Sequence, residues 1–164
     1  DEWLAGKTVL ISDYFEYYRL AAYLSWRTKE RIGIVMGVPS LVELFDEKYY
    51  TQLPGGILES FGRLFKNDLK LYVYPYRPNV SDEVQTVNTL KVSHELRPLY
   101  DYLAGRGSFV PLDNYKPEYL SIFSRDVLKR IASQEVSWEE MVPVQVAETI
   151  KKRGFFGFSE GAIR

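Results

Sequence analysis

The chain has 164 residues, of which 46% are hydrophobic and 15% aromatic, so it can bury a core and is not a globally disordered protein. Lys and Arg number 21 against 22 Asp and Glu, and the net charge of −1 gives no general attraction to nucleic acid or anionic lipid. The absence of cysteine excludes disulfides, thiolate zinc sites, iron–sulfur clusters and cysteine nucleophiles.

Neither a membrane span nor a signal peptide is expected from the sequence. It contains no run of about 18 apolar residues, and the acidic start Asp1-Glu2-Trp3 has no signal-peptide pattern. We therefore expect a cytoplasmic chain that forms one α/β domain over residues 1–164. Because the first residue is not Met, we also expect either a piece of a longer polypeptide or a processed form.

The first part of the chain alternates between β-rich runs and helical patterns. Parallel strands need a crossover connection, so this alternation predicts βαβ units. The predicted strands are Lys7–Ser12, Ile32–Met36 and Leu69–Tyr74. The predicted helices are Tyr14–Thr28, a segment that opens at Gly37–Ser40 and ends near Tyr50, and Ile57–Phe65.

The second part of the chain is richer in helices. Pro75–Glu83 is a polar loop with two prolines. The predicted strands are a short edge strand within Val84–Val92 and a fourth strand at Ser108–Leu112; the predicted helices are Glu95–Gly105 with Pro98 in its first turn, Tyr119–Ser133 and Val142–Arg153. We expect Phe155, Phe156 and Phe158 of the C-terminal tail to dock on the core.

These elements predict a three-layer α/β domain with a mainly parallel sheet of about four strands and helices on both faces. Ile32–Met36 is expected at the centre, between Lys7–Ser12 and Leu69–Tyr74. The expected core residues are Val9, Ile11, Ile34, Met36, Leu44, Phe45, Phe61, Leu71, Val73, Leu99, Leu103, Val127, Ile131 and Val146.

Two glycine-containing segments are candidate phosphate contacts. Gly37–Ser40 passes from a strand end to a helix start, where free N–H groups and the helix dipole favour anions. Gly55 and Gly56 permit close backbone approach at the start of another helix. Both segments also read as plain structural turns, and neither is a dinucleotide fingerprint or a Walker loop.

The remaining polar candidates also have two readings. His94 is the only histidine, so it is either a single acid, base or phosphate donor or a surface residue, and no histidine-rich metal site exists. The adjacent acids Asp46-Glu47 and Glu139-Glu140 point about 100° apart on a helix and predict solvated faces. The many tyrosines indicate either core packing or a partly apolar, partly wet surface such as a subunit interface; they are Tyr14, Tyr17, Tyr18, Tyr23, Tyr49 and Tyr50.

Ile122–Ile150 resembles the C-terminal segment of nicotinamide-nucleotide adenylyltransferases, which has the form ISGTxIRxxLxxGExWxxxVPxxVAxxI. The matching positions, with one extra residue before the tryptophan, are Ile122, Ile131, Trp138, Val142-Pro143, Val146-Ala147 and Ile150. The segments LPGGILESFGRLFKNDLKLYVYP and YLSIFSRDVL with WEEMVP also resemble bacterial proteins described as nicotinamide-nucleotide adenylyltransferase-like. The resemblance implies a Rossmann-like nucleotidyltransferase fold and a nucleotide ligand, such as ATP or NMN with Mg²⁺.

The chain differs from this family at the motifs that bind phosphate and carry out catalysis. The family's phosphate-binding [HT]-x-G-H motif is absent, its motif arginine falls on Leu128, and its serine falls on Phe123. Arg125, Lys129 and Arg130 remain nearby to hold a phosphate, and Arg125 and Lys129 lie one helical turn apart on one face. The alternative is that this face turns to solvent and that Leu128 points inward.

Two functions therefore stand as hypotheses. The first is a nucleotidyltransferase-like domain that binds a nucleotide or phosphorylated ligand without catalysis by this chain alone. The second is a non-catalytic interaction or scaffold module within a larger protein or a homo-oligomer, with no nucleic-acid or membrane partner.

Overall fold

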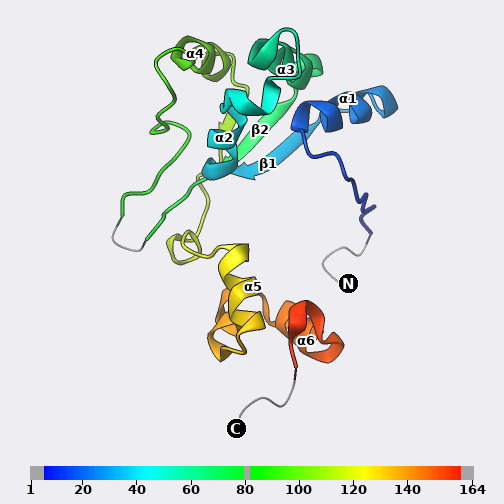
Figure 1. Cartoon of the computed structure of the whole chain (residues 1–164), viewed down its shortest axis with the longest axis vertical. Helices are drawn as coiled ribbons and strands as arrows, with labels where there is room; N and C mark the ends of the chain where they lie inside the picture. The colour runs from blue at the N-terminus through cyan, green and yellow to red at the C-terminus, as the bar shows by residue number, and fades with distance from the viewer. Residues whose placement is uncertain (1–5, 80–81, 160–164) are drawn as a thin grey trace. The chain divides into compact units, whose positions relative to one another are not determined.

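The computed structural model describes residues 6–79 and 82–159, which divide into two compact units. Unit 1 consists of Asp1–Tyr76 and Val84–Asp113, and unit 2 of Arg77–Glu83 and Asn114–Arg164 (Figure 1). Each unit has its own hydrophobic core, where the sequence predicted one domain with one core.

Unit 1 is built on a small parallel sheet. Its strands are β1 (Gly33–Gly37), β2 (Lys70–Tyr74) and β3 (Phe109–Pro111), in the spatial order β1-β2-β3. In the register, Ile34 lies opposite Leu71 and Leu71 opposite Phe109. The predicted α/β class and parallel pairing are confirmed. The described residues form three strands rather than four, and β2 rather than β1 is central.

The predicted strand Lys7–Ser12 is wrong. These residues form no strand, and the expected core residues Val9 and Ile11 are 57% and 93% exposed. Strand propensity reflects packing against neighbours more than backbone preference. The β-branched run therefore predicted a strand for which the structure supplies no neighbour. Within Val84–Val92, likewise, the described residues form only one isolated bridge, in which Gln85 pairs with Tyr76.

Four helices accompany this sheet: α1 (Tyr17–Arg27), α2 (Val38–Leu44), α3 (Gly56–Leu64) and α4 (Arg97–Gly105). The helix expected to run from Gly37 to Tyr50 ends at Leu44, because Phe45 leaves helical geometry with ψ near 7°. Asp46 then caps a separate 3₁₀ turn, Glu47–Tyr50, by accepting a hydrogen bond from Lys48 N at 3.2 Å.

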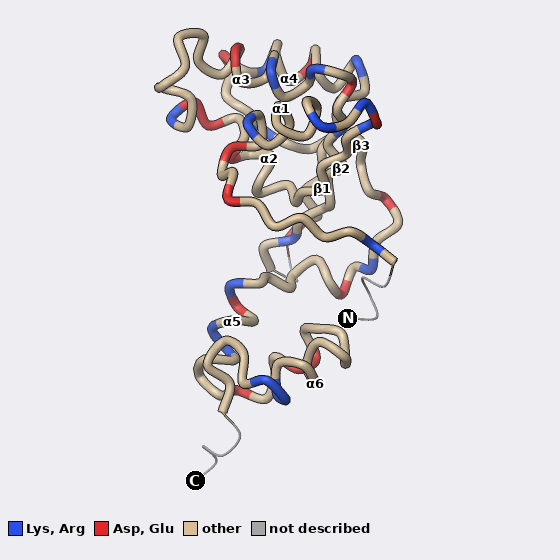
Figure 2. Tube along the Cα trace, turned by 90° about the vertical axis from the view of Figure 1, so that its right-hand side faces the viewer, with Lys and Arg blue, Asp and Glu red and all other residues tan. Residues whose placement is uncertain are grey.

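The core of unit 1 lies between this sheet and the helices. Along β2 the side chains alternate, with Leu71 and Val73 at 0% and 2% exposure and their neighbours only partly buried. The helices lie on the side of the sheet that carries Leu71 and Val73 (Figure 2). Unit 1 therefore has two layers rather than the three predicted, because its own helices cover only one face.

The described part of unit 2 contains two helices, α5 (Ser124–Ala132) and α6 (Val144–Arg153), and three 3₁₀ turns at Pro117–Tyr119, Val136–Met141 and Phe155–Gly157. Its buried core consists of Val127, Ile131, Trp138, Ala147 and Ile150.

Two expectations for unit 2 need correction. Val146 is 37% exposed and its neighbour Ala147 faces the core instead. Of the three tail phenylalanines, Phe158 packs on Trp138 with the ring centroids 6.0 Å apart, whereas Phe155 and Phe156 are 41% and 59% exposed. The other predicted core residues of both units are buried or partly buried. Over the described ranges, no helix combines the length and apolar character that crossing a membrane requires.

Candidate functional site

The predicted phosphate contacts Gly37 and Ser40 lie at the junction of β1 and α2. Gly37 ends β1 and caps α2 with no side-chain hydrogen bond, and Pro39 lies in the first turn. Because α2 is only seven residues long, its dipole is weak support for an anion. Ser40 instead lines a pocket whose other residues were not predicted as ligand contacts.

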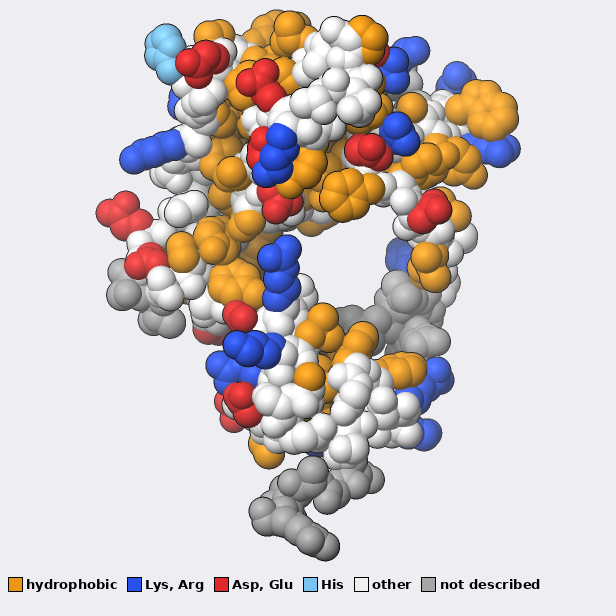
Figure 3. All heavy atoms as spheres, viewed as in Figure 1, with side chains coloured by type: hydrophobic (Ala, Val, Ile, Leu, Met, Phe, Trp, Pro, Cys, Tyr) orange, Lys and Arg blue, Asp and Glu red, His pale blue; other side chains and the backbone are white. Residues whose placement is uncertain are grey.

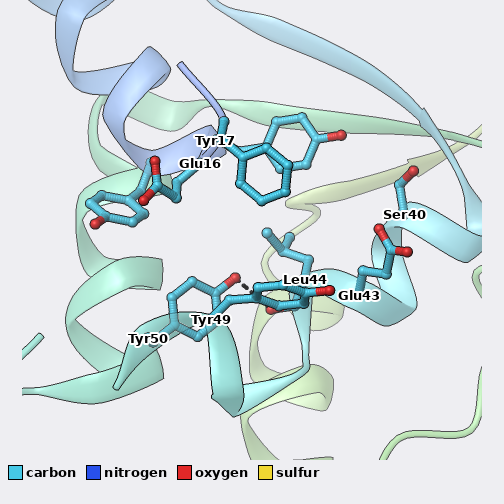
Figure 4. A pocket seen from close by; sticks show the side chains of 9 residues that line it. Glu16, Tyr17, Ser40, Glu43, Leu44, Tyr49 and Tyr50 are labelled. Atoms are coloured by element: carbon cyan, nitrogen blue, oxygen red, sulfur yellow. Dashed lines mark hydrogen bonds between the residues drawn. The ribbon is translucent and has the colours of Figure 1, made fainter. Parts of the chain in front are cut away.

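This pocket, the tyrosine pocket, has a volume of about 140 Å³. Figure 4 shows Glu16 and Tyr17 on one side, Tyr49 and Tyr50 on the opposite side, and Ser40 with Glu43 at one end. Its lining consists of Phe15, Glu16, Tyr17, Tyr18, Ser40, Glu43, Leu44, Tyr49 and Tyr50.

Buried tyrosines fix the shape of the tyrosine pocket. The Tyr50 hydroxyl donates to the Leu44 carbonyl oxygen at 2.8 Å, which ties the 3₁₀ turn to α2. The ring of Tyr18 on α1 lies against the ring of Tyr50, with 6.5 Å between the ring centroids. Both residues are about 95% buried, at 5% and 4% exposure, so packing locks their positions. Burial raises the pKa of Tyr50 from 10.0 to about 12, so burial favours the protonated hydroxyl.

Charges around the tyrosine pocket favour cations. The pocket is lined by the two carboxylates Glu16 and Glu43 and contains no basic side chain. Arg19 approaches from outside: its Nε donates to the Tyr18 hydroxyl at 3.3 Å and lies 3.7 Å from Glu16. These contacts, the hydrogen bond to Tyr18 first, raise the pKa of Arg19.

A second cation of the chain approaches the same cluster of rings. Lys48 Nζ lies 4.7 Å from the centroid of the Tyr49 ring and forms an ion pair with Asp46. The hydrogen bond between them raises the pKa of Lys48 and lowers the pKa of Asp46. Aromatic faces attract cations through the ring quadrupole. Two cations of the chain thus lie close to rings that line the pocket, Arg19 to Tyr18 and Lys48 to Tyr49.

A second hollow, the basic groove, lies between α1 and α3. It has a volume of about 500 Å³ and contains three cationic side chains and no carboxylate. Trp26 on its edge is 75% exposed, and the Arg27 guanidinium lies 4.2 Å from the centroid of the Trp26 ring. Over α1, Figure 3 shows basic side chains next to large hydrophobic ones. The lining consists of Ala22, Ser25, Trp26, Lys29, Arg63, Lys66 and Asn67.

The predicted contacts Gly55 and Gly56 lie at the start of α3. The carboxylate of Glu59, a residue of the same helix, already occupies this position. Gly55 N donates to Glu59 Oε2 at 2.9 Å, and the other oxygen of Glu59 pairs with Arg63. Gly56 has φ of +53°, a conformation that glycine adopts at little cost. A phosphate at this place must displace the Glu59 carboxylate.

The last three candidates lie on exposed surfaces. His94 is exposed in the turn before α4, and Arg125 and Lys129 are exposed on α5 of unit 2. The expectation that Leu128 points inward is wrong, because this side chain is 42% exposed while Val127 and Ile131 are buried.

The structure therefore brings Gly37 and Ser40 together and makes neighbours of Gly55 and Gly56. Neither pair lies in a basic cavity. The sequence indicated either core packing or a partly wet surface for the tyrosines of the pocket. Tyr18 and Tyr50 are buried, whereas Tyr49 is 40% exposed. The basic groove was missed, because its residues come from two segments whose basic residues follow no shared pattern. Within residues 6–79 and 82–159, no three His, Cys, Asp or Glu side chains come together to hold a metal ion.

The chain matches no known family model, and neither a curated protein nor a solved structure matches it. Four of the residues on which the sequence suggested a resemblance to the adenylyltransferases belong to the buried core of unit 2: Ile131, Trp138, Ala147 and Ile150. Their role in this structure is packing.

Proposed function

We propose that this chain is a non-catalytic interaction module whose tyrosine pocket holds a cationic group of a partner protein, namely the ammonium of a lysine or the guanidinium of an arginine. The observation that supports this proposal is the composition of the pocket, four tyrosines with two carboxylates around a volume of about 140 Å³. A cavity of this size takes the end of one side chain rather than a whole nucleotide.

Ring faces and carboxylates attract the same kind of ligand. A cation placed over a tyrosine ring gains about 0.5–2 kcal/mol, more where water is excluded. Glu43 has no ion-pair partner among the described residues, so its charge is available to a ligand. A phosphate is repelled by the same two carboxylates, which counts against the predicted nucleotide contact at Ser40.

The tyrosine pocket contains one serine, Ser40, and neither a His nor a Lys among its lining residues. A serine–histidine or serine–lysine pair for nucleophilic catalysis is therefore not part of this pocket. Its rings and carboxylates support binding of a cation.

Titration of the protein with N-acetyl-arginine amide, followed by amide NMR shifts, tests this proposal. We expect saturable shifts at Ser40, Tyr49 and Tyr50, and about tenfold weaker binding by Glu43→Gln. Tyr49→Ala should weaken binding, whereas Tyr49→Phe should keep it, because the ring face rather than the hydroxyl makes the contact.

Glu47→Gln is the matched control, since Glu47 is exposed on the adjoining 3₁₀ turn but lies outside the pocket. Equal loss of binding in Glu43→Gln and Glu47→Gln would show that the affinity depends on the net charge of the protein and not on a contact with Glu43. An absence of saturable shifts at the pocket residues, or equal binding of the neutral N-acetyl-norleucine amide, would contradict the proposal.

A second candidate function is binding of a nucleotide or phosphorylated ligand, and the basic groove favours it. Lys29 and Lys66 have no ion-pair partner among the described residues. The exposed Trp26 provides a ring on which a base can stack. Calorimetry with ATP, NMN and NAD tests this function. Lys66→Ala should weaken binding about tenfold, while Lys116→Ala on unit 2 should not change it; no heat with any of the three would contradict it.

A further inference from the structure

The segment Lys7–Ser12 has the composition of a strand but forms no strand or bridge with any of the described residues. Val9, Leu10 and Ile11 are 57%, 63% and 93% exposed, and none of residues 7–12 belongs to a strand. At the end of the segment the Ser12 hydroxyl accepts a hydrogen bond from Tyr14 N at 3.1 Å. Three consecutive apolar residues are thus left in water ahead of α1.

The edge of β1 that faces away from β2 carries backbone groups that could pair with such a strand. Ile32 O accepts from Lys70 N at 3.1 Å, so alternate residues of this segment bond to β2. The N–H and C=O groups of the residues between them, Gly33 and Val35, consequently point away from the sheet. Among the described residues, no backbone hydrogen bond outside the regular elements involves Gly33 or Val35, and the Val35 side chain is 69% exposed.

The edge of β1 lacks the features that usually prevent an exposed sheet edge from pairing with another strand. Proteins blunt exposed edges with lysine, proline, bulges or covering segments, because an open edge pairs readily with another strand. The sequence of β1, GIVMG, has no charge and no proline, and its register with β2 is regular. β1 is therefore suited to receive a strand.

We propose that Lys7–Ser12 of one copy of this chain adds as a strand to the β1 edge of a second copy, and that the exchange is reciprocal. Six extended residues span about 20 Å, enough to cover the five residues of β1. Each copy carries both the unpaired strand and the open edge, so a two-fold symmetric dimer satisfies both at once.

A second copy is preferred over another partner because the required strand is already part of this chain. Within one copy the segment leads into α1 and stays unpaired. The proposal goes beyond the function of the tyrosine pocket, since it involves neither the pocket's rings nor its carboxylates.

The oligomeric state as a function of concentration is the first test. Sedimentation velocity from about 1 µM to about 100 µM should show a monomer–dimer equilibrium for the parent protein. Ile11→Asp places a charge in the exchanged strand and should weaken dimerisation at least about tenfold. Leu58→Asp is the matched control, because Leu58 is 66% exposed on α3, and should dimerise like the parent. A parent protein that stays monomeric, or an Ile11→Asp variant that dimerises equally well, would overturn the proposal.

Disulfide trapping is the second test. Because the chain has no cysteine, only the introduced cysteines can form disulfides. Copies with Val9→Cys or Ile11→Cys are mixed with copies carrying Val35→Cys under mild oxidation. We expect mixed disulfides to form at least about tenfold faster than in the pairing with Leu58→Cys copies. Equal rates for the two pairings would reject the exchange. A chain carrying both Ile11→Cys and Val35→Cys that closes its disulfide within one monomer would also reject it.

Discussion

Units 1 and 2 bury their cores in different ways. In unit 1 the rings contact one another in a chain, with Phe45 4.9 Å from Phe61 and 5.4 Å from Tyr100 between centroids. Unit 2 packs two short helices around one large side chain, Trp138, which is 1% exposed. The core of unit 1 is therefore distributed over many side chains, whereas that of unit 2 depends on one.

This difference predicts different responses to damage. A distributed core loses part of its packing when one ring is removed, and neighbouring rings still exclude water. A small core built around one indole loses its centre, and small units have little stability in reserve. Unit 2 should thus be the first part of the chain to open.

Trp138→Ala should have the largest effect. Removing a buried tryptophan typically costs about 3–5 kcal/mol, which is on the order of the whole stability of a unit this small. We expect unit 2 to lose its protection from amide hydrogen exchange while α1–α4 and the sheet of unit 1 keep theirs, as measured by mass spectrometry of peptides.

Trp26→Ala is the matched control, since Trp26 is 75% exposed and its removal should cost about 0.5 kcal/mol or less. If Trp138→Ala opens unit 1 together with unit 2, the two units unfold cooperatively. The proposed difference between their cores would then be wrong.

Leu71→Ala tests the distributed core and should rank second. Leu71 is 0% exposed on the central strand, and the cavity left by its side chain should cost about 3 kcal/mol. Urea unfolding followed by circular dichroism measures this loss, with Val35→Ala on the exposed side of β1 as the control. A loss as small as that of the control would show that β2 does not support the core of unit 1.

The regular elements were largely predictable because burial imposes periodicity. The apolar runs at β1, β2 and β3 and the helical patterns of α1, α3 and α4 were recognised within a few residues. Lys7–Ser12 was not, since its composition is that of a strand but pairing depends on neighbours that the sequence does not reveal. Val146 and Ala147 were exchanged because a one-residue error in helix phase rotates the face by about 100°.

The candidate sites were less predictable. The tyrosines were noticed, but Glu16 and Glu43 complete the tyrosine pocket only when α1 and α2 come together. Glycines at Gly37 and Gly55 indicated anion sites. The structure instead places two carboxylates in the pocket that Ser40 lines and bonds the Glu59 carboxylate to Gly55 N. Charge at a site is decided by residues distant in sequence, and local patterns carry no information about them.

Tyr50→Phe should have a smaller effect within the core of unit 1. It removes the hydrogen bond to the Leu44 carbonyl oxygen and should cost about 1 kcal/mol at neutral pH. The folded-state pKa of about 12 lies above the ordinary value of 10.0, so the neutral phenol stabilises the fold. This contribution is complete below about pH 10 and is lost as the pH rises toward 12.

Urea unfolding at about pH 9 and about pH 11 should therefore show a steeper loss of stability for the parent than for Tyr50→Phe, by on the order of 1 kcal/mol. Tyr102→Phe is the control, because Tyr102 is 64% exposed. Identical pH dependence of the parent and Tyr50→Phe would show that Tyr50 is not held neutral by its burial.

Arg125→Ala and Lys129→Ala should have the smallest effects and compare the two units at their surfaces. Both side chains are exposed on α5 and have no ion-pair partner among the described residues, so each substitution should change stability by about 0.5 kcal/mol or less. Neither should alter the affinity for ATP in calorimetry, whereas Lys66→Ala in the basic groove of unit 1 should lower it. A loss of ATP affinity in Arg125→Ala that matches or exceeds the loss in Lys66→Ala would instead assign the phosphate contact to unit 2, as the resemblance to the adenylyltransferases implies.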